Sequence, residues 1–262
     1  MESTVLLMTT ASSGIKELDK LLGGGVPQGT QILLEVETGT GPLLFIEKWL
    51  CEGVRQKKVC FLYSFDYSAE TILQKFAEFG IIPKEFFKMG KIVDFWTKGE
   101  EYVRDFSKSI ITIGEPTNIN RVIDIIHGIW QEYRDNFETE NGSRINLVRS
   151  ATYSLSTIIM TFGFDKTYKL IKELTQVAKN ENAITMDMIG IGMHTSMETK
   201  TFEFLYDAVV RLEIKEVNGE FKRYLRVVKS PIFDYETKKI PYEFMKNDIV
   251  LLKPDKKEKY TF

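Results

Sequence analysis

The pattern of apolar and polar positions predicts alternating strands and helices through much of the chain. An almost continuous apolar run at 30–36 has the length of a buried strand, and a glycine-containing turn and a helix at 42–53 follow it. A second pair has a strand at 59–65 and a helix that begins after Ser68 and ends by Gly80. Successive strand–helix pairs favour a parallel sheet covered by helices.

The same alternation continues toward the C-terminus, although its pattern is less clear in the middle of the chain. The further expected elements are strands at 110–113, 144–148 and 183–191 and helices at 118–134 and 167–180, with a polar loop at 136–143. Asn218-Gly219 separates two β-rich segments at 208–217 and 221–229, and this residue pair favours a type I′ hairpin. We therefore expect an α/β fold in one domain over 1–262, with antiparallel strands near its end and a charged tail at 253–262.

Composition and charge narrow the functional classes. Of the 262 residues, 43% are hydrophobic and 27% are charged, which is typical of a globular domain. The formal net charge is -2, so the chain has no global positive field for a nucleic-acid backbone. No segment has the pattern of a targeting peptide, and no apolar run approaches the roughly 18 residues of a membrane span. We expect a cytoplasmic protein with no membrane partner.

Cysteines and histidines give no indication of a metal site. Cys51 and Cys60 have neither zinc spacing nor redox-pair spacing, and we interpret both as buried apolar residues. His127 and His194 are isolated from other ligand types, so a structural role is expected for each.

A dense signature near the N-terminus carries a family resemblance. The segment SSGIKELDKLLGGGVPQG at 12–29 resembles the opening signature of KaiC-like and RadA-like ATPases, S-T-G-x-x-x-L-D-x-L-L-G-G-G-[IV]-P-x-G. Later landmarks follow in the family's order, at 36–43, 63–66 and 223–229. The resemblance implies a RecA-like fold: a mostly parallel twisted sheet flanked by helices, with a C-terminal antiparallel hairpin. It also implies assembly into rings or filaments with ATP between subunits.

The expected phosphate loop departs from the pattern that binds nucleotides. A working loop reads G-x-x-x-x-G-K-[ST], in which backbone amides and the Lys hold phosphate and the hydroxyl holds Mg²⁺. Here residues 36–43 read VETGTGPL, so Gly39, Thr40 and Gly41 would be a vestigial nucleotide-binding turn. Pro42 replaces the Lys and also removes an amide donor, although proline is well suited to begin a helix. Leu43 cannot ligate Mg²⁺, so we expect neither ATP nor Mg²⁺ as a cofactor.

Two further positions suggest that the chemistry is lost. The expected strand that ends at Val148 is followed by Arg149, where the family has a metal-binding Asp, so Arg149 is interpreted as a disabling substitution. Arg149 could form an ion pair that fills the vacant site, or it could bind an anion. Asp66 falls where the family has a catalytic Glu, but without metal or phosphate it would have no substrate to act on. No catalytic residue and no metal site are therefore expected.

Three functional hypotheses follow from these residues. The first is a non-catalytic KaiC/RadA-like protein that acts as a scaffold or regulator, either as a homo-oligomer or with an active KaiC- or RadA-like ATPase; its partner could be a protein or a peptide. The second is a nucleotide sensor that binds weakly, without Mg²⁺, through the amides of Thr40 and Gly41. The third is a DNA-binding accessory protein that uses Arg223, Tyr224 and Arg226, although a solvated hairpin face explains the same pattern, so nucleic-acid binding is expected to be weak.

Overall fold

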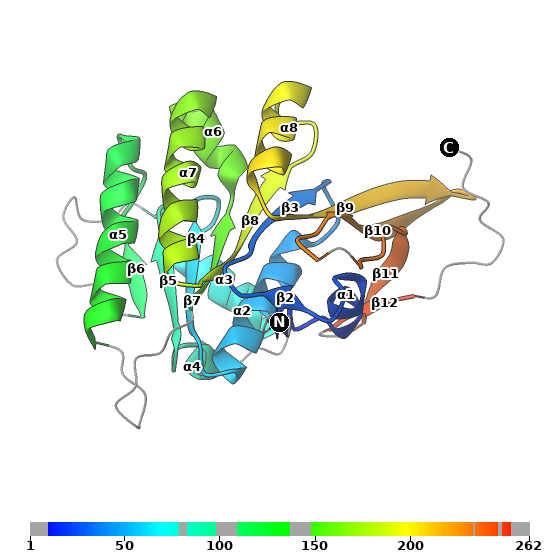
Figure 1. Ribbon diagram of the computed structural model, residues 1–262, viewed down its shortest axis with the longest axis horizontal. Helices are drawn as coiled ribbons and strands as arrows, with labels where there is room; N and C mark the ends of the chain where they lie inside the picture. Colours follow the sequence, from blue (N-terminus) through cyan, green and yellow to red (C-terminus); the bar gives the residue numbers. More distant parts are fainter. Residues whose placement is uncertain are drawn as a thin grey trace, which may run out of the picture.

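A ten-stranded sheet forms the centre of the molecule (Figure 1). The structure is a computed structural model that describes residues 10–78, 83–97, 109–136, 148–232, 234–245 and 248–252. Its strands, in spatial order, are β12 (Asp248–Leu251), β11 (Ile240–Met245), β10 (Glu220–Lys229), β9 (Ala208–Val217), β3 (Gln31–Val36), β8 (Ile184–Gly190), β7 (Val148–Tyr153), β4 (Val59–Ser64), β5 (Gly90–Asp94) and β6 (Ile110–Thr112). Strands from β9 to β6 are parallel, and β9 to β12 are antiparallel neighbours. A second, two-stranded sheet joins β1 (Thr10–Ala11) and β2 (Val26–Pro27).

Helices cover both faces of the large sheet (Figure 1). Their bounds are α1 (Lys16–Leu21), α2 (Pro42–Arg55), α3 (Ala69–Glu78), α4 (Pro83–Phe86), α5 (Ile119–Asn136), α6 (Leu155–Phe162), α7 (Phe164–Asn180) and α8 (Ser196–Leu205). Successive residues of β3 point to opposite faces: Ile32 and Leu34 pack with α1 and α2, whereas Leu33 packs with the core that includes α5, α6 and α7. The two cores therefore lie on opposite sides of one sheet, which explains the unbroken apolar run in this strand.

The fold class expected from the sequence is confirmed. The hairpin turn has positive φ at both Asn218 (55°) and Gly219 (82°), as a type I′ turn requires. Ser68 caps α3 as expected, since its hydroxyl accepts a hydrogen bond from the amide of Thr71 at 3.1 Å. The pattern did not predict β1, β2, β5, β11, β12, α4, α6 or α8. The loop at 136–143 and the tail at 253–262 lie outside the described residues, apart from residue 136, which belongs to α5.

One strand expectation is wrong, and the error affects the site. Residues 144–147 of the expected strand lie outside the described residues, and the described strand β7 does not end at Val148 but runs from Val148 to Tyr153, beside Ser64 of β4. The polar residues Arg149, Ser150 and Thr152 hid this strand from the apolar pattern, although all of β7 is buried. Arg149 therefore lies at the amino end of the strand, and Tyr153 lies at its carboxyl end.

Candidate functional site

A cavity of about 480 Å³ opens at the carboxyl ends of β3, β4, β7 and β8. The loops and helix starts that follow these strands form most of its wall, and Phe244 of β11 closes one side. Open α/β sheets bind ligands outside the carboxyl ends of their strands, and this volume is in the range of small-molecule sites. The position expected for the phosphate loop is part of this wall.

The turn at 37–41 keeps the backbone shape of a strand-to-helix loop. Gly39 and Gly41 have φ of 87° and 67°, and Gly41 is the N-cap of α2, which begins at Pro42. Proline thus occupies the helix position where its missing amide costs least. The Thr40 hydroxyl and amide both donate to the carbonyl of Glu37, at 2.6 and 3.3 Å. The amide of Thr40 is therefore already used inside the turn.

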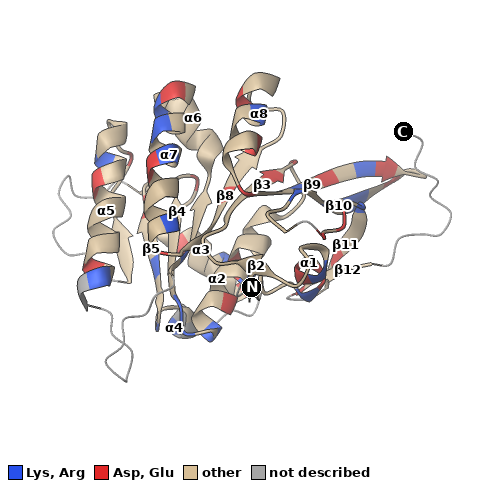
Figure 2. Ribbon diagram, in the orientation of Figure 1, with Lys and Arg blue, Asp and Glu red and all other residues tan. Residues whose placement is uncertain are grey.

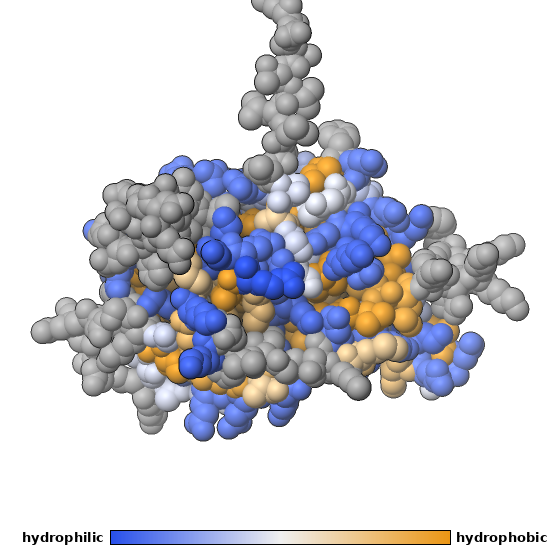
Figure 3. Space-filling view, turned by 90° about the horizontal axis from the view of Figure 1, so that it is seen from below, coloured by the Kyte–Doolittle hydropathy of each residue, from blue (hydrophilic) through white to orange (hydrophobic). Residues whose placement is uncertain are grey.

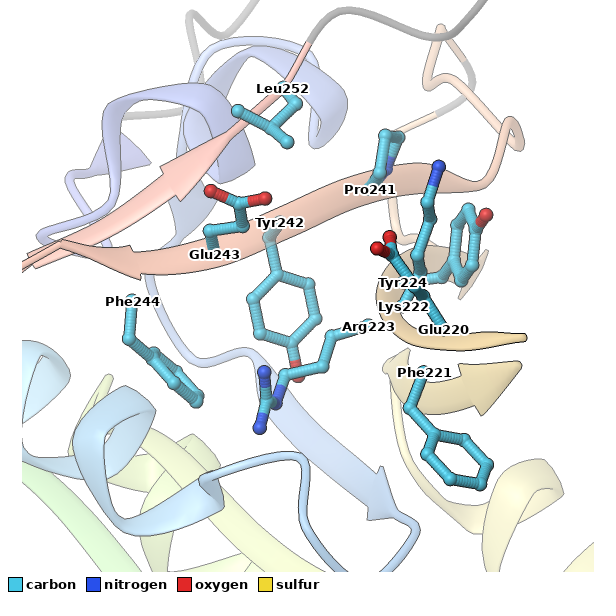
Figure 4. A pocket seen from close by; sticks show the side chains of 10 residues that line it. All are labelled: Glu220, Phe221, Lys222, Arg223, Tyr224, Pro241, Tyr242, Glu243, Phe244 and Leu252. Carbon is cyan, nitrogen blue, oxygen red and sulfur yellow. The ribbon is translucent and has the colours of Figure 1, made fainter. Parts of the chain in front are cut away.

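Side chains from β10 and β11 lie directly against this turn (Figure 4). The hydroxyl of Tyr242 donates to the carbonyl of Thr40 at 2.7 Å, and Nε of Arg223 donates to the carbonyl of Gly39 at 2.8 Å. The Phe244 ring packs so closely on Gly41 that a Cβ at this glycine would overlap the ring. The Arg223 guanidinium lies 4.9 Å from the centre of the same ring. We call Arg223, Tyr242 and Phe244 the loop cover.

The residues at the turn do not fit Mg²⁺-bound ATP. Pro42 has neither an ammonium nor an amide to offer a phosphate, and the buried side chain of Leu43, which packs in the core, has no oxygen for a metal ion. A phosphate would accept from the backbone amides of the turn, and the amide of Thr40 is already bonded to the carbonyl of Glu37. In the part of the chain that the structure describes, no group of three or more His, Cys, Asp and Glu side chains could hold a metal ion.

The structure places Arg149 at the opposite end of β7 from the metal-binding position that the sequence predicts for it. Its side chain is buried at the amino end of β7, where it donates to the carbonyl of Trp49 at 2.8 Å and to the Gln56 side chain at 3.3 Å. The guanidinium also lies 4.3 Å from the centre of the Trp49 ring. The prediction that Arg149 replaces a metal-binding carboxylate is therefore wrong. The carboxyl end of this strand carries Tyr153, which lines the cavity.

Asp66 does lie at the cavity, as its position after a strand predicts. It follows β4 by two residues, and its carboxylate accepts a hydrogen bond from the hydroxyl of Thr157 in α6. The neighbouring Tyr67 ring lies 5.5 Å from the ring of Tyr153. A catalytic role for Asp66 stays untested, but the structure brings it together with Gly39 and Gly41 on one wall.

The three hairpin residues suggested for nucleic acid do not form a common binding strip. Tyr224 is only 3% exposed, so its ring cannot stack on a base. Arg223 is bonded to the turn, and Arg226 is half-buried. Charged residues of both signs alternate along this hairpin and on the outer helices (Figure 2). The geometry therefore contradicts the suggestion that Tyr224 stacks within a basic strip.

The sequence pattern did not identify several residues of the site. Tyr242 and Phe244 lie on either side of Glu243 in β11, and this short pattern does not show that the strand lies against a turn some 200 residues earlier. Lys75 lies in a helix that was predicted, yet only the fold shows that it lines the cavity. Glu47, buried one turn into α2, gave no signal because charged residues are normally exposed.

The parallel sheet, the glycine turn between β3 and α2, and the antiparallel C-terminal strands define a protein of the RecA-type P-loop class. The chain belongs to the KaiC family of ATPases, since the family described as "ATPase: KaiC" matches residues 11–256. No helix among the described residues is both long and apolar enough to cross a membrane.

Individual relatives support the same assignment. A UPF0273 protein of Pyrococcus furiosus is 24% identical over 254 residues, which cover 95% of this chain and 96% of the relative. The circadian clock protein KaiC3 of Synechocystis is 24% identical over 224 residues, covering 83% of this chain but 38% of that protein. The crystal structure of a KaiC-like protein from Pyrococcus horikoshii has a TM-score of 0.71 at 20% identity and covers 94% of this chain and 100% of that chain. This last likeness supports the fold alone.

Proposed function

We propose that this chain is a KaiC-family protein that does not hydrolyse ATP and acts by binding other proteins. The observation that carries the proposal is the turn itself: Pro42 and Leu43 stand where a working P-loop has its Lys and hydroxyl, and the chain's own Arg223, Tyr242 and Phe244 bond to and pack on the turn. These contacts come from two neighbouring strands of the sheet, so opening the turn would also disturb the sheet. The loop cover, like the replacements at Pro42 and Leu43, thus works against nucleotide binding at the turn.

The chemistry at the end of β7 supports the same proposal. A metal-assisted reaction needs oxygen ligands for Mg²⁺, and the carboxyl end of this strand carries the phenol of Tyr153. Burial raises the pKa of Tyr153 far above its usual value, so the phenol stays neutral and is a poor metal ligand. Asp66, two residues after β4, contributes a carboxylate to this wall, and it already accepts a hydrogen bond from Thr157.

A surface for protein contacts lies where β10 and β11 separate. Among the described residues these strands pair only at 223–225, and beyond this point a cavity of about 430 Å³ lies between them (Figure 4). Within the part of the chain that the structure describes, residues 220–222 of β10 and 243–245 of β11 therefore have no strand partner on this side, and Phe221, one of these residues, is 74% exposed. An extended segment of another chain can add to such an edge. The face in Figure 3 also shows hydrophobic surface gathered toward the right of the view.

The partner is proposed to be a second copy of this chain or an active KaiC- or RadA-like ATPase. A Mg²⁺-independent nucleotide sensor is less well supported, because one of its two expected amide donors, that of Thr40, is used within the turn. Neither proposal needs nucleic acid.

Two measurements test the proposal. Purified protein should release no phosphate from Mg²⁺-ATP above a buffer blank, whereas steady release that survives repurification and is lost in Asp66→Asn would overturn the first half. For the second half, light scattering and affinity capture from native lysate should reveal an oligomer or a specific partner. Phe221→Glu should weaken that contact about tenfold or more, and the matched control Phe204→Glu, 88% exposed on α8, should not. A strict monomer without any specific partner would contradict the contact role.

A further inference from the structure

The cavity at the carboxyl ends of β3, β4, β7 and β8 has wall chemistry of its own, apart from the covered turn. Aromatic and aliphatic side chains from separate elements line it, among them Tyr67, Tyr153, Leu44, Met188 and Met193. Leu44, Met188 and Tyr153 are almost fully buried, whereas Met193 is 52% exposed and lies at its mouth. Such walls suit an apolar molecule better than a highly charged one.

One cation faces this apolar wall. Lys75 comes from α3, and its ammonium lies 5.7 Å from the centre of the Tyr67 ring. Within the described residues the ammonium has no ion-pair partner. A lysine that is half-buried beside an aromatic ring, with its donors not used by a carboxylate, can hold an anionic group of a bound molecule.

The acidic groups near Lys75 do not cancel its charge. Burial raises the pKa of Glu47 to about 9 and outweighs the lowering effect of Lys75, so the carboxyl group of Glu47 is neutral at pH 7. Glu78, one turn further along α3, is exposed, so solvent screens its charge. The two carboxylates on the cavity wall each accept a donor from the protein: Asp66 from the Thr157 hydroxyl, and Glu37 from the amide of Ile214 at 2.6 Å. With these carboxylates on the same wall, the one ammonium of Lys75 can balance a single negative charge but not the several charges of a triphosphate.

We propose that this cavity is a binding site for a small apolar molecule that carries one anionic group, which Lys75 holds. The apolar body would lie against Tyr67, Tyr153 and the buried aliphatic wall. This ligand class differs from Mg²⁺-bound nucleotide, and the inference does not depend on the proposed protein contacts. Binding at this site requires neither a lysine nor a metal ligand in the turn at 37–41.

A pair of matched fluorescent probes tests the site. 8-Anilinonaphthalene-1-sulfonate has an apolar body and one negative charge, and N-phenyl-1-naphthylamine has nearly the same body without the charge. With the full chain at pH 7, the sulfonate should bind one saturable site about tenfold more tightly than the neutral probe. Lys75→Met should abolish this difference, and Lys172→Met, an exposed lysine of α7 on the other face, should preserve it.

A second variant tests whether the probes bind in this cavity or on other apolar surface. Met193→Trp, at the half-exposed mouth, should weaken both probes at least fivefold because the indole fills the entrance. Circular dichroism and urea unfolding establish that each variant is folded. Equal affinities of the two probes for the wild-type protein, an unchanged preference in Lys75→Met, or unchanged binding in Met193→Trp would each overturn the proposal.

Discussion

Gly41 shows most directly how single residues shape the site. Its φ of 67° is in the left-handed region, and the Phe244 ring occupies the space where a side chain would begin. In a working P-loop a glycine here is explained by phosphate. In this chain the turn conformation and the packed ring are sufficient reasons to keep it.

Gly41→Ala should therefore lower the free energy of unfolding by roughly 2–4 kcal/mol, because it combines left-handed strain with overlap of the Phe244 ring. The matched control is Gly29→Ala: φ at this glycine is 77°, but no heavy atom lies within 4 Å of a Cβ, so roughly 1 kcal/mol of backbone strain is expected. Urea unfolding measures both changes. Equal losses in the two variants would mean that Phe244 does not press on the turn.

Glu47 is the other residue with an unusual environment. It is fully buried in α2, and neither of its carboxyl oxygens has a hydrogen-bond partner among the described residues. Burial raises its pKa from the ordinary value of 4.5 to about 9. The folded protein therefore keeps a proton that the unfolded chain releases above pH 4.5, so the contribution of Glu47 to stability is full below that pH and falls as the pH rises toward 9.

We expect the stability of the wild-type protein, relative to Glu47→Gln, to decrease steadily from pH 5 to pH 9, because the glutamine stays neutral throughout. Urea unfolding of both proteins at several pH values across this window measures the difference. A difference that stays constant with pH, or that grows in favour of the wild type, would show that Glu47 is ionised in the folded protein.

At the scale of elements, β11 connects the C-terminal strands to the turn. Tyr242 is 1% exposed, its hydroxyl bonds to the carbonyl of Thr40, and its ring packs edge-on against Phe45 of α2 at 5.4 Å. Strand β11 also pairs with both β10 and β12, so the cover is part of the sheet.

Tyr242→Phe should lower the free energy of unfolding by about 1–3 kcal/mol, since it keeps the ring packing but leaves the buried carbonyl of Thr40 without this donor. Tyr235→Phe is the control: its hydroxyl makes a long contact of 3.4 Å with the carbonyl of Val228, and a change below about 0.5 kcal/mol is expected. If the two substitutions have the same effect in urea unfolding, the contact of β11 with the turn does not stabilise the protein.

Elements with strong periodicity could be predicted from the sequence, and those defined by distant contacts could not. The apolar run of β3 and the amphipathic pattern of α7 led to the observed elements within a few residues. Strand β7 was misplaced because Arg149, Ser150 and Thr152 lie in it, and the burial of Arg149 depends on Trp49 and Gln56, which only the fold brings close. The departures at Pro42 and Leu43 were visible in the sequence, but the loop cover was not.

For the whole molecule, a RecA-type framework surrounds a turn that is covered from within. The parallel strands and the helices on both faces are those of the KaiC family, and family membership alone does not establish ATP hydrolysis. Phe244 lines two regions that remain open: the apolar cavity with Lys75, and the space between β10 and β11. We propose both as binding regions, and neither proposal requires a bound nucleotide.

The most direct measurement is an equilibrium titration of the pure protein with a fluorescent ATP analogue, with and without Mg²⁺. Because Pro42 and Leu43 supply no phosphate or metal contacts and the loop cover occupies the turn, we predict no saturable Mg²⁺-dependent binding up to roughly millimolar analogue. Saturable binding with a submicromolar dissociation constant that requires Mg²⁺ would contradict the central claim that this turn does not hold Mg²⁺-bound ATP.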